Sequence, residues 1–259
     1  MLERLSNRLV RLNVIALILL LTFAPLVNAA ETIRLANGEW APFQSQHLKH
    51  SGFISHVIKE SFELEGYVVK FEYMPWKRGY RQARYGVLDG TFVWGKTSER
   101  EEQFYFSDVV INLTTSIFHQ TGKEIVWNNI EDLGKYRIGG VIGYDYELSE
   151  YEKSGAISIT RKTSLEGILK MLAKDRLDIV FSDVDVGLYS VNQLGLQNEI
   201  IVSDKKINEN KSFYLLISKE IENGEEIIEK FNQGLKILKQ SGKFEKFQED
   251  NRKGEYILK

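Results

Sequence analysis

Arg100 is the side chain whose type and position most directly suggest ligand chemistry. It follows the apolar segment 91–94 and stands beside Trp94 in a Thr97-x-x-Arg100 step. An arginine guanidinium is planar and always charged, so it can hold a carboxylate through two parallel hydrogen bonds. A carboxylate that loses its water in a closed site needs such a fixed partner. We therefore expect Arg100 to bind an anionic group; the alternative is a surface arginine paired with neighbouring glutamates.

Aromatic and acidic side chains lie at the ends of other apolar segments. These residues are Trp40, Trp76, Trp94 and Asp183. Aromatic walls exclude water at low cost in rotamer freedom and favour cationic or apolar parts of a ligand. Each tryptophan could instead fill a core, and Asp183, with Asp185 as its rival, could instead cap the next helix.

Strand-like and helix-like segments alternate along the chain, which predicts mostly parallel sheets with helices on both faces. The expected strands are 33–36, 68–73, 91–94, 136–142, 178–181, 199–202 and 213–217. The expected helices are 52–65, 76–87, one that opens with a capping box at 163–166, 186–194, 225–240 and a last one within 243–259. In such folds ligands bind beyond the carboxyl ends of strands, so Trp40, Trp94 with Arg100, and Asp183 should share one rim.

The first 29 residues have the layout of a secretory signal peptide. Three arginines precede an aliphatic segment, 14–23, and small residues follow at 29–30. The apolar segment is short for a membrane-spanning helix, which needs roughly 20 residues. We expect cleavage after Ala29 and a periplasmic protein; an uncleaved N-terminal anchor is the alternative.

Composition narrows the classes of protein further. The 259 residues contain no cysteine, so an exported chain must rely on its core, and the N-terminus offers no cysteine for lipid attachment. The formal net charge is −2, and removal of the first 29 residues would make it more negative, so we expect no nucleic-acid partner. His47-x-x-His50 lacks nearby carboxylates or cysteines, and we expect neither a metal nor a cofactor.

Several short motifs together resemble the family 3 extracellular solute-binding proteins, the polar-amino-acid binders of ABC importers. The motifs are Gly86-x-x-Asp89, Thr97-x-x-Arg100, Phe106-Ser107-Asp108, Trp40-Ala-Pro-Phe43, Gly52-Phe53, and Arg176-Leu-Asp178-Ile with Asp183 five residues on. The order of elements matches over essentially the whole chain after residue 29. Pro75-Trp76-Lys-Arg78-Gly-Tyr80 resembles a divergent branch of that family.

The resemblance implies two α/β lobes joined by two hinge strands, the type II periplasmic-binding-protein fold. We expect the first lobe at 30–115 plus 214–259 and the second at 116–213. The resemblance also implies that Arg100 pairs with a ligand carboxylate, that Trp40 and Trp76 sandwich the ligand, and that Asp183 takes its ammonium group. It further implies a monomer that binds a small molecule and serves an inner-membrane ABC permease.

The sequence departs from the family pattern around this site. Val93-Trp94-Gly95 replaces small hydroxyl residues before Thr97-x-x-Arg100, and Gly143-Tyr144-Asp145 replaces a glycine followed by serine or threonine. We add Thr97, Tyr144, Asp145 and Arg78 to the candidate ligand contacts. The altered pocket puts a standard α-amino acid in question and leaves cationic, aromatic or amide-bearing ligands open.

Two other classes of function remain open. An enzyme on the same scaffold, similar to cyclohexadienyl dehydratases, could use Asp145 or Asp183 as an acid in a dry cleft. A stand-alone sensor that signals to a membrane kinase is a further alternative. Hydrolase, phosphate-loop and dinucleotide motifs do not occur, so we expect a binding protein and not an enzyme.

Overall fold

The computed structural model describes residues 30–258, with the exception of residues 145 and 147. The expected signal peptide and Asp145 lie outside this part of the chain. The strands are β1 (Thr32–Asn37), β2 (Val68–Tyr73), β3 (Gly90–Trp94), β4 (Phe104–Phe106), β5 (Ile111–Gln120), β6 (Ile138–Val141), β7 (Ile159–Lys162), β8 (Ile179–Asp183) and β9 (Ile200–Ser218).

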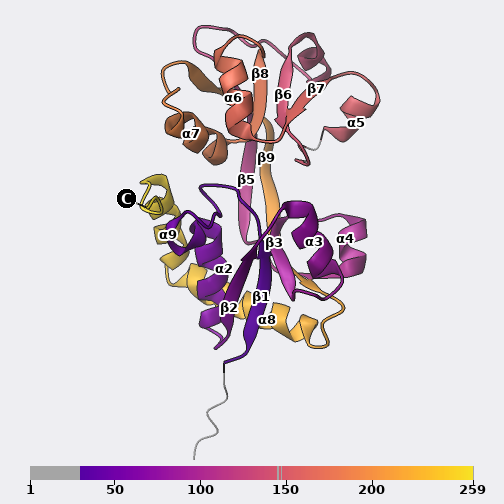
Figure 1. Cartoon of the computed structure of the whole chain (residues 1–259), viewed down its shortest axis with the longest axis vertical. Coiled ribbons are helices and arrows are strands. Elements are labelled where there is room, and N and C mark those ends of the chain that lie inside the picture. The colour runs from indigo at the N-terminus through magenta and orange to yellow at the C-terminus, as the bar shows by residue number, and fades with distance from the viewer. Residues whose placement is uncertain (1–29, 145, 147, 259) are drawn as a thin grey trace, which may run out of the picture. The chain divides into compact units, whose positions relative to one another are not determined.

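Helices follow most of the strands (Figure 1). They are α2 (Phe53–Glu63), α3 (Trp76–Arg84), α4 (Ser98–Gln103), α5 (Ser149–Lys153), α6 (Leu165–Ala173), α7 (Val184–Gln193), α8 (Gly224–Gln240) and α9 (Lys243–Arg252), with 3-10 helices η1 (Lys49–Ser51) and η2 (Ile130–Lys135). None of the helices in the described ranges combines the length and the apolar character that a membrane span requires.

The strands form one path in the order β2-β1-β3-β9-β5-β8-β6-β7, with β4 beside β9. Parallel pairing joins β1 to β2 and β3, and β6 to β7 and β8. Strand β9 pairs antiparallel with β3, β4 and β5. Each lobe of this α/β fold is therefore a parallel set of strands with antiparallel strands added at one side.

Strands β5 and β9 pass between the two sets of strands (Figure 1). The predicted strands 199–202 and 213–217 are the two ends of the single strand β9. Its first part pairs with β5, and its last residues pair with β3 and β4. The prediction of two separate strands was wrong because the middle of β9 is polar and half-exposed, so it lacks the apolar alternation that marks a strand.

Each set of strands has its own buried cluster of apolar side chains. In the first, the facing helices α2 and α8 contribute residues such as Phe62 and Phe231, whose rings lie 5.0 Å apart. In the second, β5 and β8 contribute Ile117 and Phe181, and α6 contributes Leu169. Burial of this apolar surface is the main force that holds a chain without disulfides together.

Several element boundaries differ from the sequence prediction, and those of α6 and α3 have a clear local cause. Ser164, not Thr163, caps α6, because its side chain accepts a hydrogen bond from the backbone N–H of Gly167. Helix α3 ends at Arg84, before the predicted end at residue 87, in a turn where Gly86 adopts a positive φ of 67°.

Candidate functional site

Four of the predicted residues form a continuous series of contacts in the first lobe. The Arg100 guanidinium lies 4.9 Å from the Trp94 ring centre, in a cation–π arrangement. The rings of Trp94 and Trp76 lie 5.6 Å apart, and those of Trp76 and Trp40 lie 6.5 Å apart, each pair edge to face. The structure therefore brings the arginine and the three tryptophans together.

The series continues into the second lobe through Tyr144. The rings of Trp40 and Tyr144 lie 6.2 Å apart, also edge to face. Asp183 is close enough to influence Tyr144 electrostatically. Residues from β3, α3 and the loop after β1 thus meet residues from the loop after β6 and from the end of β8. The opposite charges of Arg100 and Asp183 mark the two ends of this line.

The backbone of β3 is irregular just before Trp94, on the chain that leads to Arg100. Val93 has a φ of 63°, which is unusual for a β-branched residue, and the register with β9 shifts between Phe92 and Trp94. The Trp94 indole Nε1 donates a hydrogen bond of 3.0 Å to Thr91 Oγ1. Backbone strain of this kind gathers at binding and catalytic sites, where the surrounding structure holds it in place.

Arg100 keeps most of its hydrogen-bonding capacity. Its Nη1 donates a 2.7 Å bond to the Gly95 carbonyl, and the side chain is half-buried against Trp94 and Tyr80. A guanidinium has five N–H donors. The Tyr80 hydroxyl also approaches the guanidinium, and further N–H donors remain for a carboxylate.

Close backbone packing positions the other two tryptophans. Trp40 and Gln44 form an antiparallel bridge, and the Trp40 ring packs 5.3 Å from Phe43. Gly38 is required beside Trp76, because a Cβ there would lie 2.4 Å from the indole ring. These contacts leave the indole of Trp76 directly over the chain that follows β1.

Tyr144 is held by an arginine that sequence reasoning did not single out. Arg161 on β7 donates from Nη1 to the carbonyls of Val141 and Tyr144, at 3.0 and 3.1 Å, and pairs through Nη2 with Glu152. Protein surrounds the Tyr144 phenol, and this burial, followed by the charges of Tyr146 and Asp183, raises its pKa. The ring is therefore neutral and fixed in place.

Asp183 caps a helix, and its carboxyl group is largely surrounded by protein. Its Oδ1 accepts bonds from the backbone N–H groups of Asp185 and Val186, at 3.0 and 3.3 Å, so it caps α7 as the sequence alternative foresaw. The residue keeps some solvent exposure, but protein crowds its carboxyl group. Burial, and then the charge of Asp185, raise the pKa of Asp183 to about 7, against the opposing effect of the backbone hydrogen bonds.

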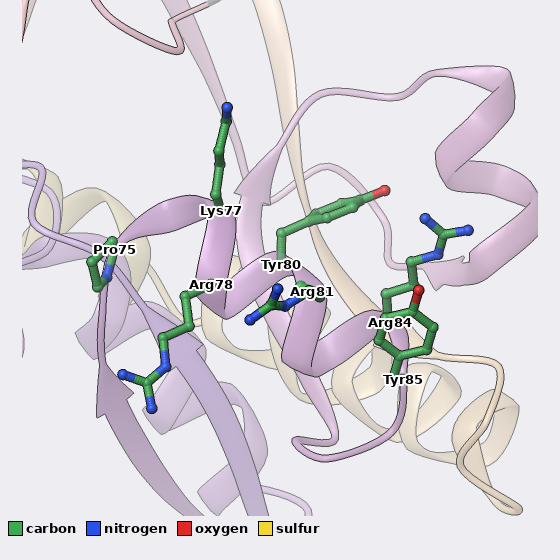
Figure 2. A pocket seen from close by; sticks show the side chains of 7 residues that line it. All are labelled: Pro75, Lys77, Arg78, Tyr80, Arg81, Arg84 and Tyr85. Atoms are coloured by element: carbon green, nitrogen blue, oxygen red, sulfur yellow. The ribbon is translucent and has the colours of Figure 1, made fainter.

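Two predicted residues lie away from this series. Thr97 is exposed, and its Oγ1 accepts a bond from the Arg100 backbone N–H, so it caps α4. Arg78 is exposed on α3, where it lines a shallow concavity with other basic side chains (Figure 2). Asp145 lies outside the described residues.

Buried polar groups beside Trp40 escaped the sequence analysis. The Trp40 Nε1, the Asn37 Oδ1 and both side-chain atoms of Gln44 are buried without a hydrogen-bond partner in the structure. The Tyr73 hydroxyl approaches Ser51 and Asn37 without forming a well-aligned hydrogen bond. Buried polar atoms without partners are uncommon, and they tend to be satisfied by water or a ligand. No sequence pattern marks them, because each depends on neighbours from distant segments.

The histidines also differ from a metal-binding arrangement. The ring of His50 stacks on that of His56, 4.1 Å between centres, and His56 Nδ1 lies 2.8 Å from the Tyr256 hydroxyl. Burial, and then the charge of His50, lower the pKa of His56 to about 4. In the part of the chain that the structure describes, no group of three potential metal ligands occurs.

Solved structures share this fold at low sequence identity. An ancestral arginine-binding protein bound to arginine has 21% identity and a TM-score of 0.71, over 86% of this chain and 99% of its own. AbpA from Streptococcus pneumoniae Canada MDR_19A, bound to L-arginine, has 19% identity and a TM-score of 0.70, over 89% and 97%. A histidine kinase sensor domain similar to periplasmic binding proteins has 18% identity and a TM-score of 0.71, over 86% and 96%.

The sequence itself carries a family signature. None of the curated proteins compared with the chain matches it. The profile of the bacterial extracellular solute-binding proteins, family 3, matches residues 34–251, which include most of β1, both crossing strands and nearly all of α9. This range takes in every described residue of the contact series from Arg100 to Asp183. The chain belongs to the family 3 bacterial extracellular solute-binding proteins.

Proposed function

We propose that the protein captures a small polar, carboxylate-bearing molecule, an amino acid or a related compound, between its two lobes. The series of contacts from Arg100 through the tryptophans to Tyr144 and Asp183 carries this proposal. In this proposal the guanidinium pairs with a carboxylate, and Asp183, at the other end of the series, accepts from an ammonium group. The aromatic rings between them would exclude water around both charged groups.

Contacts from both lobes would provide the free energy of closure. A ligand shifts an open–closed equilibrium only by its difference in affinity for the two forms. Arg100 and the tryptophans lie on one side of the crossing strands, and Tyr144 and Asp183 lie on the other, so a bridging ligand binds the closed form better. Strands β5 and β9 are the hinge in this proposal, and the lobes divide at 30–115 plus 214–259 and at 116–213.

The unpartnered atoms of Asn37, Trp40 and Gln44 favour a ligand with a further polar group. These atoms are neutral and include both donors and acceptors. An amide, hydroxyl or guanidinium group, or the water that bridges to one, would satisfy them. This supports a polar side chain on the ligand in preference to an aliphatic one.

Cell location and partner belong to the same proposal. We propose that the chain is exported through a cleaved signal peptide to the periplasm, acts as a monomer, and offers its closed form to an inner-membrane ABC permease. The family match supports a place outside the cytoplasm.

A binding screen tests the proposal directly. Amino acids, polyamines, small peptides and organic acids are added in a thermal-shift assay, and binders are titrated by calorimetry. A ligand at 100 times its Kd stabilises the folded state by about 2.7 kcal/mol, a readily visible shift. We expect a carboxylate-bearing compound to bind; if only compounds without a carboxylate bind, the assignment of Arg100 is wrong.

Two arginine substitutions distinguish a specific carboxylate contact of Arg100 from a general effect of losing one positive charge. Arg100→Gln should weaken binding of the identified ligand by about tenfold to a hundredfold, because a hydrogen-bonded charge pair contributes about 1.5–3 kcal/mol. Arg81→Gln, which removes an exposed arginine of α3, is the matched control and should leave affinity unchanged. Retention of affinity within about threefold in Arg100→Gln would contradict the proposed carboxylate contact.

One observation supports an enzyme as the second candidate. A general acid works best with a pKa near the working pH, and Asp183 has a pKa of about 7 beside the buried phenol of Tyr144. A dehydratase acting on cyclohexadienyl acids would use such a group. Turnover of prephenate or arogenate, lost in Asp183→Asn, would establish it; stoichiometric binding without turnover would exclude it.

A further inference from the structure

Helix α3 carries an unusual concentration of exposed cations. Four basic side chains lie on it, and each is exposed: Lys77, Arg78, Arg81 and Arg84. Within the described residues none of the four makes an ion pair or a side-chain hydrogen bond. Like charges three or four residues apart destabilise a helix by about 0.2–0.5 kcal/mol per pair. The helix therefore carries a repulsion that a negative partner would remove.

Lys77, Arg81 and Arg84 are four and three residues apart and lie on one side of α3, Arg78 extends away from Lys77, and the four cations do not converge on one point. They line a shallow concavity with Pro75, Tyr80 and Tyr85 (Figure 2). In Figure 2 Lys77 and Arg78 extend in opposite directions from the helix, and Arg84 points away from both. A single small anion would contact one or two of these groups at most. The arrangement fits an extended negative surface better than one phosphate or carboxylate.

Exposed apolar side chains adjoin the cations. Tyr85 and Val87, just beyond the end of α3, are 63% and 56% exposed. Basic residues next to exposed aromatic and aliphatic side chains are typical of surfaces that lie at a membrane interface, where the cations meet lipid headgroups and the apolar groups enter the boundary region.

Within the described ranges, acidic groups lie near this surface without pairing with its cations. Glu99 acts electrostatically on Tyr80, and the Glu220 Cβ would lie 3.0 Å from a Cβ placed on Gly86. Neither forms an ion pair with the four cations in the described part of the chain. The whole chain has a net charge of −2, so this local cluster of four positive charges is opposite in sign to the net charge of the chain.

We propose that the face formed by Lys77, Arg81 and Arg84 with Tyr85 and Val87, here called the basic α3 face, binds an anionic phospholipid surface. The spread of the cations and the absence of a converging site favour a lipid surface over a single acidic side chain of a protein. The same helix carries Trp76 and Tyr80, whose rings contact Trp94, but the cations of the basic α3 face are exposed, so their proposed role does not depend on the proposed ligand.

Vesicle binding tests the proposal on the protein without its first 29 residues. The probes are vesicles of phosphatidylcholine alone and vesicles that contain 30 mol% phosphatidylglycerol, about a third anionic lipid. We expect binding to the anionic vesicles alone, with a steep loss as salt rises from about 50 to 200 mM. Each cation near such a surface contributes roughly fivefold in affinity.

Matched charge variants identify the surface. The test variant is Lys77→Gln/Arg81→Gln/Arg84→Gln, which leaves Arg78 unchanged. The control is Lys170→Gln/Lys174→Gln/Arg176→Gln, which removes the same charge from exposed residues at the end of α6. We expect at least a tenfold loss of vesicle affinity in the test variant and less than a threefold loss in the control.

Three outcomes would overturn the proposal. They are no binding to anionic vesicles, equal loss in both triple variants, and binding to immobilised polyglutamate but not to vesicles, which would assign the face to an acidic protein. Both variants must retain the thermal unfolding midpoint of the parent chain, and their affinity for any identified ligand is measured in parallel. A parent chain that binds anionic vesicles but no carboxylate-bearing compound would count against the proposed function alone.

Discussion

At the scale of single residues, the site depends on charges and rings that other groups hold in place. Arg100 rests on Trp94, and Tyr144 is fastened through its carbonyl by Arg161. The Asp183 carboxylate already accepts two backbone hydrogen bonds at the start of α7, so a ligand ammonium group would share this carboxylate with the helix. The residues proposed to bind the ligand and the residues that position them are therefore distinct, and substitutions of each should be distinguishable.

The pKa of Asp183 predicts a pH-dependent stability. Its pKa is about 7 in the folded protein and has an ordinary value near 3.8 when unfolded. Between these values the folded state holds a proton that the unfolded state has lost, so stability falls as pH rises from about 4 to about 7. Asp183→Asn, which keeps a capping side chain, should remove a slope of about 2 kcal/mol over this window, allowing for partial solvent exposure.

Urea unfolding of both proteins at about pH 4.5, 6 and 7.5 measures this effect. The difference between the parent chain and Asp183→Asn should change with pH in the direction given. A constant difference across the series would show that Asp183 is ionised throughout and that its carboxyl is better solvated than the structure indicates.

Substitution of Arg161 should change the affinity for the identified ligand, because Arg161 holds the loop that carries Tyr144. Arg161→Lys keeps the positive charge but loses the planar group that reaches two carbonyls and Glu152. The loop that carries Tyr144 should then be less ordered, and affinity for the identified ligand should fall by roughly tenfold, about 1.4 kcal/mol. Hydrogen exchange of residues 141–148 is the second readout: faster exchange with reduced affinity supports the role, and reduced affinity with unchanged exchange contradicts it.

At the scale of elements, close packing of helices and strands decides where the site residues end up. Helices α2 and α8 approach so closely that a Cβ on Gly234 would lie 1.9 Å from the Ser61 carbonyl oxygen. This contact holds α8 against the helix that follows the Trp40 loop. A glycine is required there by the neighbouring backbone and not by its own conformation.

Gly234→Ala should therefore destabilise the protein by about 1–3 kcal/mol, the usual cost of forcing extra volume into a packed contact. The exposed neighbour Gln233→Ala is the control and should change stability by less than about 0.5 kcal/mol. Urea unfolding at one pH measures both. Equal stability of the two variants would mean that α2 and α8 can separate without loss of core packing.

The elements also show where sequence patterns succeed. Segments with strong periodicity, such as 68–73 and 225–240, match β2 and α8 to within one residue. Strand β5 and the middle of β9 were not predicted, because β5 shows no clean alternation of apolar and polar residues and the middle of β9 is polar, and the two segments pair with each other across the lobes. Their strand structure comes from backbone pairing with a distant segment, which no local window contains.

At the scale of the whole molecule, hinge closure predicts a change in distance between the lobes. The chain has no cysteine, so two introduced cysteines can be labelled specifically. Lys70→Cys on β2 and Lys162→Cys on β7 place exposed labels on the two sets of strands. We expect the identified ligand to increase energy transfer between the labels and to narrow the distribution of distances between them.

A labelled protein that also carries Arg100→Gln is the control, and it should require more ligand for the same change. If energy transfer stays constant at saturating ligand, binding occurs without closure, and the contribution of Tyr144 and Asp183 must be made in a single conformation. This measurement is independent of the vesicle experiment on the basic α3 face.

The sequence by itself determined the family, the α/β alternation and the identity of most residues in the contact series. These properties are local: a strand shows as an apolar segment, a helix shows as a period, and Arg100 shows as a fixed spacing from Phe106-Ser107-Asp108. The tertiary structure alone decided that the rings of Trp40 and Tyr144 meet and that Arg161 holds the Tyr144 loop. It also decided that buried polar atoms gather beside Trp40. Each of these depends on segments far apart in the chain, whose proximity is set by strand pairing and core packing and not by local sequence.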